Sequence, residues 1–220
     1  MTSSTTVHTQ GFWAELREQR WDDHRYYHQS YVNQALHLLS ALSFLTTFVL
    51  LAIHPVAAAI FGWIIAMWAR QIGHFFFEPK GYDRVNQATH EHKEEIKVGY
   101  NLQRKVALLT VWAALPLVLW FDPTLLGVYD SAAGWEAWVQ KVSMSWIVLG
   151  VLAVFARTAW LCATRNLQTG LVWATKILTD PLHDIKLYHK APLHLLKGEW
   201  IDPMDDVTGH HDSRTTATER

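Results

Sequence analysis

The stretch LHLLSALSFLTTFVLLAI-HP-VAAAIFGWIIAMWARQIGHFFF, residues 36–77, decides the fold of this chain. Two apolar runs, Leu36–Ile53 and Val56–Phe77, flank the pair His54-Pro55. A proline disfavours the helical conformation in the residue before it, so we predict that the first helix ends at this pair and that the two runs form a hairpin. Each run is close to the roughly 20 apolar residues that a membrane-spanning helix needs.

One histidine lies near the open end of each run. His37 is seventeen residues before the turn and His74 is nineteen residues after it. At a rise of 1.5 Å per residue, the two differ in depth by only about 3 Å. Imidazoles inside a membrane segment are costly and usually face a partner rather than lipid. Two at one level therefore indicate either a shared metal ion or a shared hydrogen-bond network.

Two further apolar runs, about Val106–Phe121 and Val142–Cys162, complete a set of four candidate spans. Pro116 is expected to kink the third. The alternative is a soluble bundle with long buried helices, but four nearly uncharged runs of this length argue against it. We predict an all-α integral membrane bundle of about four transmembrane helices, with a C-terminal interfacial amphipathic segment.

The placement of basic residues predicts the orientation. Of nineteen lysines and arginines, only Lys141 falls between the third and fourth runs, and none falls at residues 54–55. The positive-inside rule then places both termini and the 78–105 loop in the cytoplasm, with the bacterial inner membrane and an organelle membrane both left open. The net charge of −1 gives no general attraction to nucleic acid, so we expect none as a partner.

The chain divides into four regions by composition: an N-terminal tail (1–23), a four-span membrane domain (24–165), a cytoplasmic-side amphipathic segment (166–207) and a disordered tail (208–220). Within the loop before the third span, charge pairing over Glu91–Lys105 predicts a short surface helix. In the amphipathic segment, Asp180-Pro181 is expected to break the helix. The single Cys162 excludes an internal disulfide and a cysteine-based zinc site.

Several of the thirteen histidines are spaced to share a site. His24 and His28 lie on one helix face, as do Asn33 and His37, since each pair is four residues apart. His28 and His37 would lie on opposite faces of one straight helix. Both can reach a single site only if the helix breaks around residues 29–32.

Arg70, His74 and Glu78 form a ladder on one face of the second run. Glu78 could orient His74 through a hydrogen bond or bind a metal directly. The alternative is an interfacial salt bridge with Arg70. The pair His90 and His92 is a weaker signal, and the histidines expected on the surface are His183, His189 and His194.

Two segments carry a family resemblance. The stretch from Tyr27 to His37, YHQSYVNQALH, resembles the Tyr-His-x-x-Pro-x-Asn-x-x-x-His stretch of the membrane 2-hydroxy fatty acid dioxygenase family. The stretch from Gln71 to Glu78, QIGHFFFE, is similar to that family's Gln-Phe-x-Gly-His-x-x-Phe-Glu. Order and separation also match, over about residues 24–80. Two departures are Tyr31 in place of the family's proline and a different sequence after Glu78.

The resemblance implies a small multi-span membrane enzyme that uses iron and oxygen to shorten a 2-hydroxy fatty acid by one carbon. By this resemblance His28, His37 and His74 hold Fe(II), and Asn33 and Glu78 support them. We therefore expect His37, His74 and Glu78 to be catalytic.

The expected ligand is a fatty acid whose alkyl chain enters the bundle. Its carboxylate is then expected near Arg70 or Lys80, with Asn33 also contacting the substrate. Two alternatives remain open. One is a di-iron fatty acid hydroxylase or desaturase, although the repeated HxxHH-type boxes of those enzymes are missing. The other is a non-catalytic membrane scaffold or small transporter in which the histidines are structural.

Overall fold

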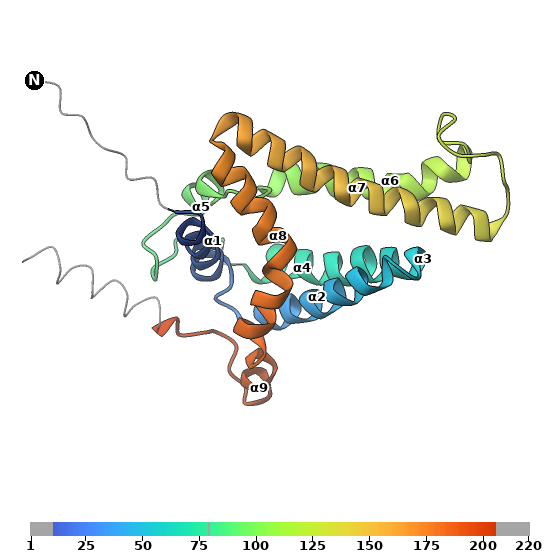
Figure 1. The fold of residues 1–220 in the computed structure, drawn as a ribbon. Coiled ribbons are helices and arrows are strands. Elements are labelled where there is room, and N and C mark those ends of the chain that lie inside the picture. The colour runs from blue at the N-terminus through green and yellow to red at the C-terminus, as the bar shows by residue number, and fades with distance from the viewer. Residues whose placement is uncertain (1–10, 79, 206–220) are drawn as a thin grey trace, which may run out of the picture.

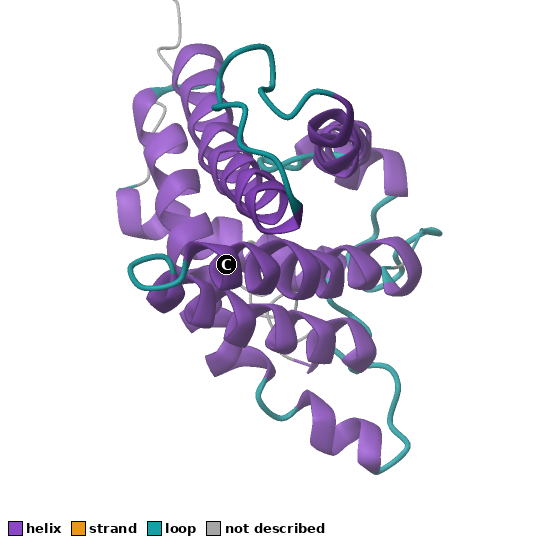
Figure 2. Cartoon of the chain, turned by 90° about the vertical axis from the view of Figure 1, so that its right-hand side faces the viewer, coloured by secondary structure: helices purple, strands orange, loops and turns teal. Residues whose placement is uncertain are grey.

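The structure is a computed structural model that describes residues 11–78 and 80–205. Every regular element in this part of the chain is helical, as Figure 2 shows, which confirms the predicted all-α class. In chain order the elements are α1 (Phe12–Tyr27), α2 (Tyr31–Leu50), α3 (Pro55–Ala59), η1 (Ile60–Met67), α4 (Trp68–Ile72), η2 (Gly73–Phe77), α5 (His90–Ile96), α6 (Leu102–Phe121), α7 (Trp135–Thr164), α8 (Leu167–Tyr188) and α9 (Ala191–Leu196).

The four predicted spans are all present. Helices α2, α6 and α7 are each long and apolar enough to cross a membrane, and so is the continuous helical segment Pro55–Phe77 that joins α3, η1, α4 and η2. The first helix ends before Pro55, as predicted, and α6 continues through Pro116. Only 11% of the apolar window is buried in each of α6 and α7, so most of their apolar side chains face outward, as expected for helices surrounded by lipid.

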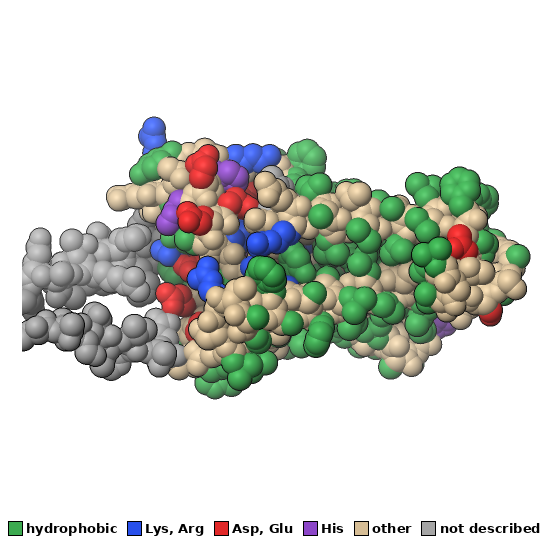
Figure 3. Space-filling model, turned by 90° about the horizontal axis from the view of Figure 1, so that it is seen from above, with side chains coloured by type: hydrophobic (Ala, Val, Ile, Leu, Met, Phe, Trp, Pro, Cys, Tyr) green, Lys and Arg blue, Asp and Glu red, His purple; other side chains and the backbone are tan. Residues whose placement is uncertain are grey.

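The spans form two helical hairpins that point the same way (Figure 1). One consists of α2 and residues 55–77, and the other of α6 and α7. Helix α8 crosses the open ends of both, packing against α2 and α7. We call this end, with α1, α5, α8 and α9, the polar end. Charged and histidine side chains gather there in Figure 3, whereas apolar side chains cover the hairpins. Its assignment to the cytoplasm stays a prediction.

Three tryptophans join the two hairpins. The indole N–H of Trp63 donates to the backbone carbonyl of Trp146 (2.7 Å), and that of Trp146 donates to the carbonyl of Trp112 (3.0 Å). The rings of Trp112 and Trp146 stack with centroids 5.1 Å apart. The Trp63 bond crosses between the hairpins, as does the stacking of Trp63 on Trp112 with centroids 5.9 Å apart, whereas the Trp146 bond joins α6 and α7 within one hairpin. The hairpins therefore hold a fixed position relative to one another beneath the polar end.

Two predictions need correction. Residues 12–23, assigned to a tail, form most of α1, which packs against α8. Residues 1–10 and the predicted tail 208–220 lie outside the described residues. Helix α8 also continues through Pro181 instead of ending there. The proline removes one helical hydrogen bond, but Asp180 accepts hydrogen bonds from Arg20 (3.2 Å) and Lys176 (2.9 Å), and these contacts hold the helix in place.

Candidate metal centre

A break between α1 and α2 turns His28 back toward His37. Helix α1 ends at Tyr27 and α2 begins at Tyr31, with Ser30 as its N-cap. The Ser30 hydroxyl accepts a hydrogen bond from the backbone N–H of Val32 (3.2 Å), the usual way that a serine starts a helix. The break lies where the sequence required it for both histidines to reach one site.

The C-terminal part of the chain clamps this break. The backbone N–H of Tyr31 donates to the carbonyl of Trp200 (3.0 Å), and that of Asp202 donates to the carbonyl of Gln29 (2.9 Å). The Gln34 amide donates both to the carbonyl of His28 (2.9 Å) and to the carboxylate of Asp202 (2.7 Å). A non-helical backbone is costly in apolar surroundings unless its polar groups are paired. These bonds provide that pairing.

Three imidazoles converge at the open end of the first hairpin. One potential ligand nitrogen from each of His28, His37 and His74 lies within 4.8 Å of the other two. The ring centroids are 4.1 Å apart for His28 and His37, 4.9 Å for His37 and His74, and 5.5 Å for His28 and His74. The predicted convergence is therefore confirmed. Within the described residues, this is the one group of three or more histidine, cysteine or acidic side chains arranged to hold a metal ion.

The hydrogen bonds of two rings show which nitrogens are free. His28 Nδ1 lies 2.8 Å from the backbone carbonyl of Asp23, which can only accept, so this nitrogen carries the proton. His74 Nδ1 lies 2.7 Å from the Glu78 carboxylate. Both rings then present an unprotonated Nε2. This is the arrangement of metal-binding histidines, whose other ring nitrogen donates to a carboxylate or carbonyl.

The third ring, His37, meets the His28 ring through its Nε2 atom. His37 Nε2 lies 3.1 Å from His28 Nε2, and its Nδ1 has no hydrogen-bond partner among the described residues but lies 3.7 Å from the Asp184 carboxylate. If His37 is neutral with its proton on Nδ1, two nitrogen lone pairs face each other at 3.1 Å. A cation between the rings would remove that repulsion, so the residues present fit a metal.

Burial keeps these rings in the form that binds metal. His28 and His37 are 5% and 1% exposed. Burial holds the pKa of His28 well below its ordinary value, and the neighbouring His37 lowers it further. A neutral imidazole has the lone pair that a metal requires. Burial also raises the pKa of Glu78, while Lys97, 3.8 Å away, opposes that shift.

His74 is positioned by a π-helical turn and a glycine. It lies in η2, and π-helical turns often occur at functional sites because they redirect side chains. The preceding residue, Gly73, packs directly on Asn33: a Cβ at this position would lie 2.1 Å from Asn33 Oδ1. The Asn33 amide is fixed because it donates to the Tyr27 carbonyl (2.7 Å). Asn33, in α2, therefore contacts both the end of α1 and η2 at the site.

Replacing Gly73 with alanine is expected to push η2 away from α2 and displace His74. Overpacking of this kind costs about 1–3 kcal/mol, and we expect a lower thermal unfolding midpoint in detergent together with weaker metal binding. Gly81→Ala is the matched control, because a Cβ there would meet nothing within 4 Å. Equal unfolding midpoints for the two variants would contradict the close packing of Gly73.

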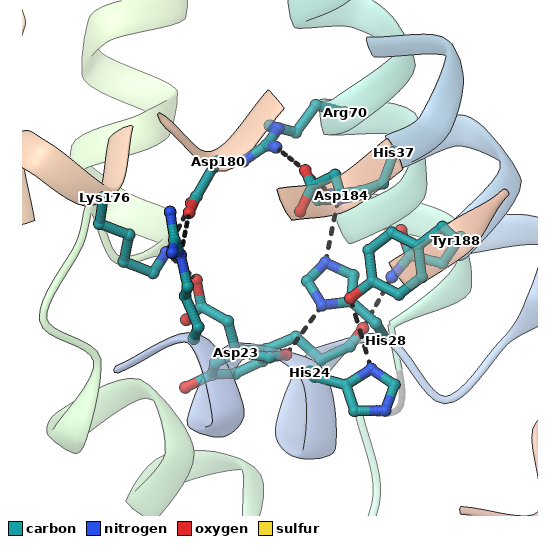
Figure 4. A network of polar contacts seen from close by, with 12 residues as sticks. Asp23, His24, His28, His37, Arg70, Lys176, Asp180, Asp184 and Tyr188 are labelled. Carbon is teal, nitrogen blue, oxygen red and sulfur yellow. Dashed lines mark hydrogen bonds and ion pairs between the residues drawn. The ribbon is translucent and has the colours of Figure 1, made fainter. Parts of the chain in front are cut away.

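Helix α8 supplies polar groups to the same site (Figure 4). The Asp184 carboxylate accepts from Arg70 (2.5 Å) and lies 3.7 Å from His37 Nδ1. Burial raises the pKa of Asp184, and the Arg70 charge opposes the rise. The Tyr188 ring lies against His28, with centroids 5.4 Å apart, and its hydroxyl is 3.4 Å from His24 Nδ1. Burial also raises the pKa of Tyr188, so its hydroxyl stays protonated.

A buried ion cluster attaches α8 to α1. The Lys176 ammonium donates to the carboxylates of Asp23 and Asp180. Burial alone would lower the pKa of Lys176, but the two carboxylates outweigh it and leave the pKa raised. Lys176 therefore stays charged at neutral pH. The backbone carbonyl of Asp23 accepts the His28 hydrogen bond, so this cluster also fixes the position of the first imidazole.

The α8 residues were missed by the sequence prediction. Lys176, Asp180, Asp184 and Tyr188 are each four residues apart. That spacing places all four on one helix face and is the signal that could have found them. Of the histidines expected on the surface, His189 is exposed, whereas His183 is half-buried beside Asp184.

The two predicted carboxylate-binding residues differ in their surroundings. Arg70 is occupied by Asp184, so its charge is already compensated inside the protein. Lys80 is exposed and lines a cavity of about 340 Å³ that also contains His74. Arg70 borders only a small pocket of about 10 Å³ beside His28 and His37, whereas Lys80 borders the larger cavity beside His74.

No protein-family model, curated protein or solved structure matches this chain. Its membrane-spanning fold and histidine cluster therefore stand on the structure alone.

Proposed function

We propose that this protein is an Fe(II)-dependent membrane dioxygenase that shortens 2-hydroxy fatty acids by one carbon. The observation that carries the proposal is the convergence of His28, His37 and His74 at the open end of a membrane hairpin. The sequence resemblance described above selects iron and the fatty acid. Imidazole also binds zinc, so the identity of the metal is part of the test.

Iron held by these three histidines would supply the activation of O₂ for the overall reaction of RCH(OH)COOH and O₂ to RCOOH, CO₂ and water. The chain's own residues orient the histidine rings. Asp23 and Glu78 accept hydrogen bonds from the Nδ1 atoms of His28 and His74 and direct the Nε2 atoms inward. Three histidine ligands would leave other coordination positions of the metal open, as an oxygenase site requires. The Tyr188 hydroxyl retains its proton because burial raises its pKa, and it lies within hydrogen-bond distance of His24 Nδ1 (3.4 Å).

The spans suit a lipid substrate. The histidines lie at the end of the hairpin, where a carboxylate can stay at the membrane surface while the alkyl chain extends between lipid and helices. Each buried CH₂ group contributes about 0.8 kcal/mol, which favours long chains. We further propose that the polar end faces the cytoplasm, because most basic residues lie there.

One metal ion is favoured over two. A di-iron hydroxylase requires two adjacent sets of ligands, whereas the described residues contain one group of three. The test is elemental analysis of detergent-purified protein, followed by oxygen consumption with a 2-hydroxy fatty acid. We expect one iron per chain and a product one carbon shorter. Zinc in place of iron, or no oxygen uptake by the iron-loaded protein, would overturn the proposal.

Glu78→Gln tests the support of His74. The amide no longer provides a negative acceptor for His74 Nδ1, and loss of such a partner typically weakens metal binding about 10- to 100-fold. We expect a loss of this size in iron titrations of Glu78→Gln. Glu95→Gln, an exposed change on α5, should bind like the wild type. Unchanged affinity in Glu78→Gln would show that the carboxylate does not hold the ring.

A further inference from the structure

A cavity of about 340 Å³ adjoins the metal centre at His74, and none of its lining residues belongs to α8. His74 lines it, together with Phe75 and Phe76 from the same π-helical turn. Phe76 is 75% exposed, so the aromatic part of the wall continues onto the outer face of the span. The cavity thus connects an imidazole of the histidine cluster with an apolar surface that faces lipid.

Most of the other residues that line the cavity are charged. They are the lysines Lys80, Lys97 and Lys105 and the carboxylates Glu78 and Glu94. Lys97 is occupied by both acids: its ammonium lies 3.0 Å from Glu94 and 3.8 Å from Glu78, and it also sits over the Tyr27 ring. The lysines outnumber the acids among the lining residues.

Lys105 differs from its neighbours. It is half-buried in the first turn of α6, and within residues 11–78 and 80–205 no carboxylate lies within ion-pair distance of its ammonium. Lys80 also lacks such a partner there, but it is exposed and therefore fully hydrated. A partly desolvated ammonium without a counter-charge favours binding of an anion. The cavity therefore combines an unpaired cation, an apolar wall and one of the three histidines.

We propose that this cavity binds the head of an amphipathic carboxylic acid, with Lys105 holding the carboxylate and Phe75 and Phe76 contacting the first carbons of the alkyl chain. The inference rests on the proposed function, because it places the acyl ligand next to His74. It also assigns the carboxylate contact to a residue of the second hairpin instead of Arg70, whose charge Asp184 already balances.

The test measures binding instead of turnover, with metal-free protein in detergent and 2-hydroxypalmitic acid as the probe. A charge-assisted hydrogen bond is among the stronger polar contacts, so we expect Lys105→Gln to weaken binding of the acid about tenfold or more, which corresponds to about 1.4 kcal/mol. Lys105→Arg should retain most of the affinity. Arg104→Gln is the matched control, since it removes the neighbouring, exposed positive charge.

A second probe separates the carboxylate from the alkyl chain. The methyl ester of 2-hydroxypalmitic acid should bind wild type and Lys105→Gln equally, because it has no charge for the lysine to balance. Equal weakening for acid and ester, or equal loss in Arg104→Gln, would overturn the assignment of Lys105. Iron binding is measured separately, on iron-loaded samples of the same variants: normal iron binding with no Lys105 effect refutes this inference alone, and a Lys105 effect without iron binding refutes the proposed function alone.

Discussion

Replacing His37 with alanine is expected to abolish stoichiometric iron binding and all oxygen consumption. His37 lies between the other two rings, 4.1 Å and 4.9 Å from the centroids of His28 and His74. Loss of a supporting partner costs metal sites about 10- to 100-fold in affinity, and loss of a ligand should cost more. We therefore expect more than about a 100-fold weakening, measured by iron titration.

The control for this variant is His54→Ala. His54 lies at the far end of the same hairpin, in the turn before Pro55. Because His37 is buried, His37→Gln should be tested too, since it preserves volume and polarity, and the fluorescence of the twelve tryptophans reports whether either variant has folded. A folded His37 variant that still binds one iron with unchanged affinity would refute the metal centre.

Replacing Asp184 with leucine is expected to have the largest effect on stability. The change leaves Arg70 without its carboxylate, and breaking a buried ion pair by removing one partner typically costs about 3–5 kcal/mol. Arg70 is 20% exposed at its side chain, so we expect a value near the lower limit. The measurement is the free energy of unfolding in mixed detergent micelles.

The double variant Asp184→Leu with Arg70→Met distinguishes the ion pair from simple packing. Apolar residues that replace both partners often restore stability, so the double variant should unfold closer to the wild type than Asp184→Leu alone. Its iron affinity should nevertheless remain weakened, because His37 Nδ1 has lost its neighbouring carboxylate. A double variant less stable than the single one would show that Arg70 and Asp184 do not act as a pair.

The spans and the pairing of His37 with His74 were predictable because each depends on local rules. An apolar run of sufficient length predicts a span, and a proline at residue 55 predicts where the hairpin turns. The depth of the two imidazoles then follows from the helical rise. The break after His28 was also predictable, because a straight helix would place His28 and His37 on opposite faces.

The contribution of α8 was not predictable in the same way. Asp184 pairs with Arg70 across 114 residues, and no local pattern indicates which helix crosses the open ends of the hairpins. The expected break at Pro181 was wrong for a related reason, because contacts from Arg20 and Lys176 hold the helix through it. Lys105 likewise lacks an ion-pair partner among the described residues because Lys97 pairs with both Glu78 and Glu94. The folded loop determines this pairing, and no local sequence pattern predicts it.

The clamp by residues 200–202 on the break after His28 has a consequence for biosynthesis. During translation, His28, His37 and His74 leave the ribosome long before Trp200 and Asp202 do. Until those late residues arrive, the backbone that presents His28 lacks its bonds to Trp200 and Asp202. A nascent chain arrested before Trp200 should therefore insert its first helices yet load iron poorly, so that maturation of the site waits for release of the finished polypeptide.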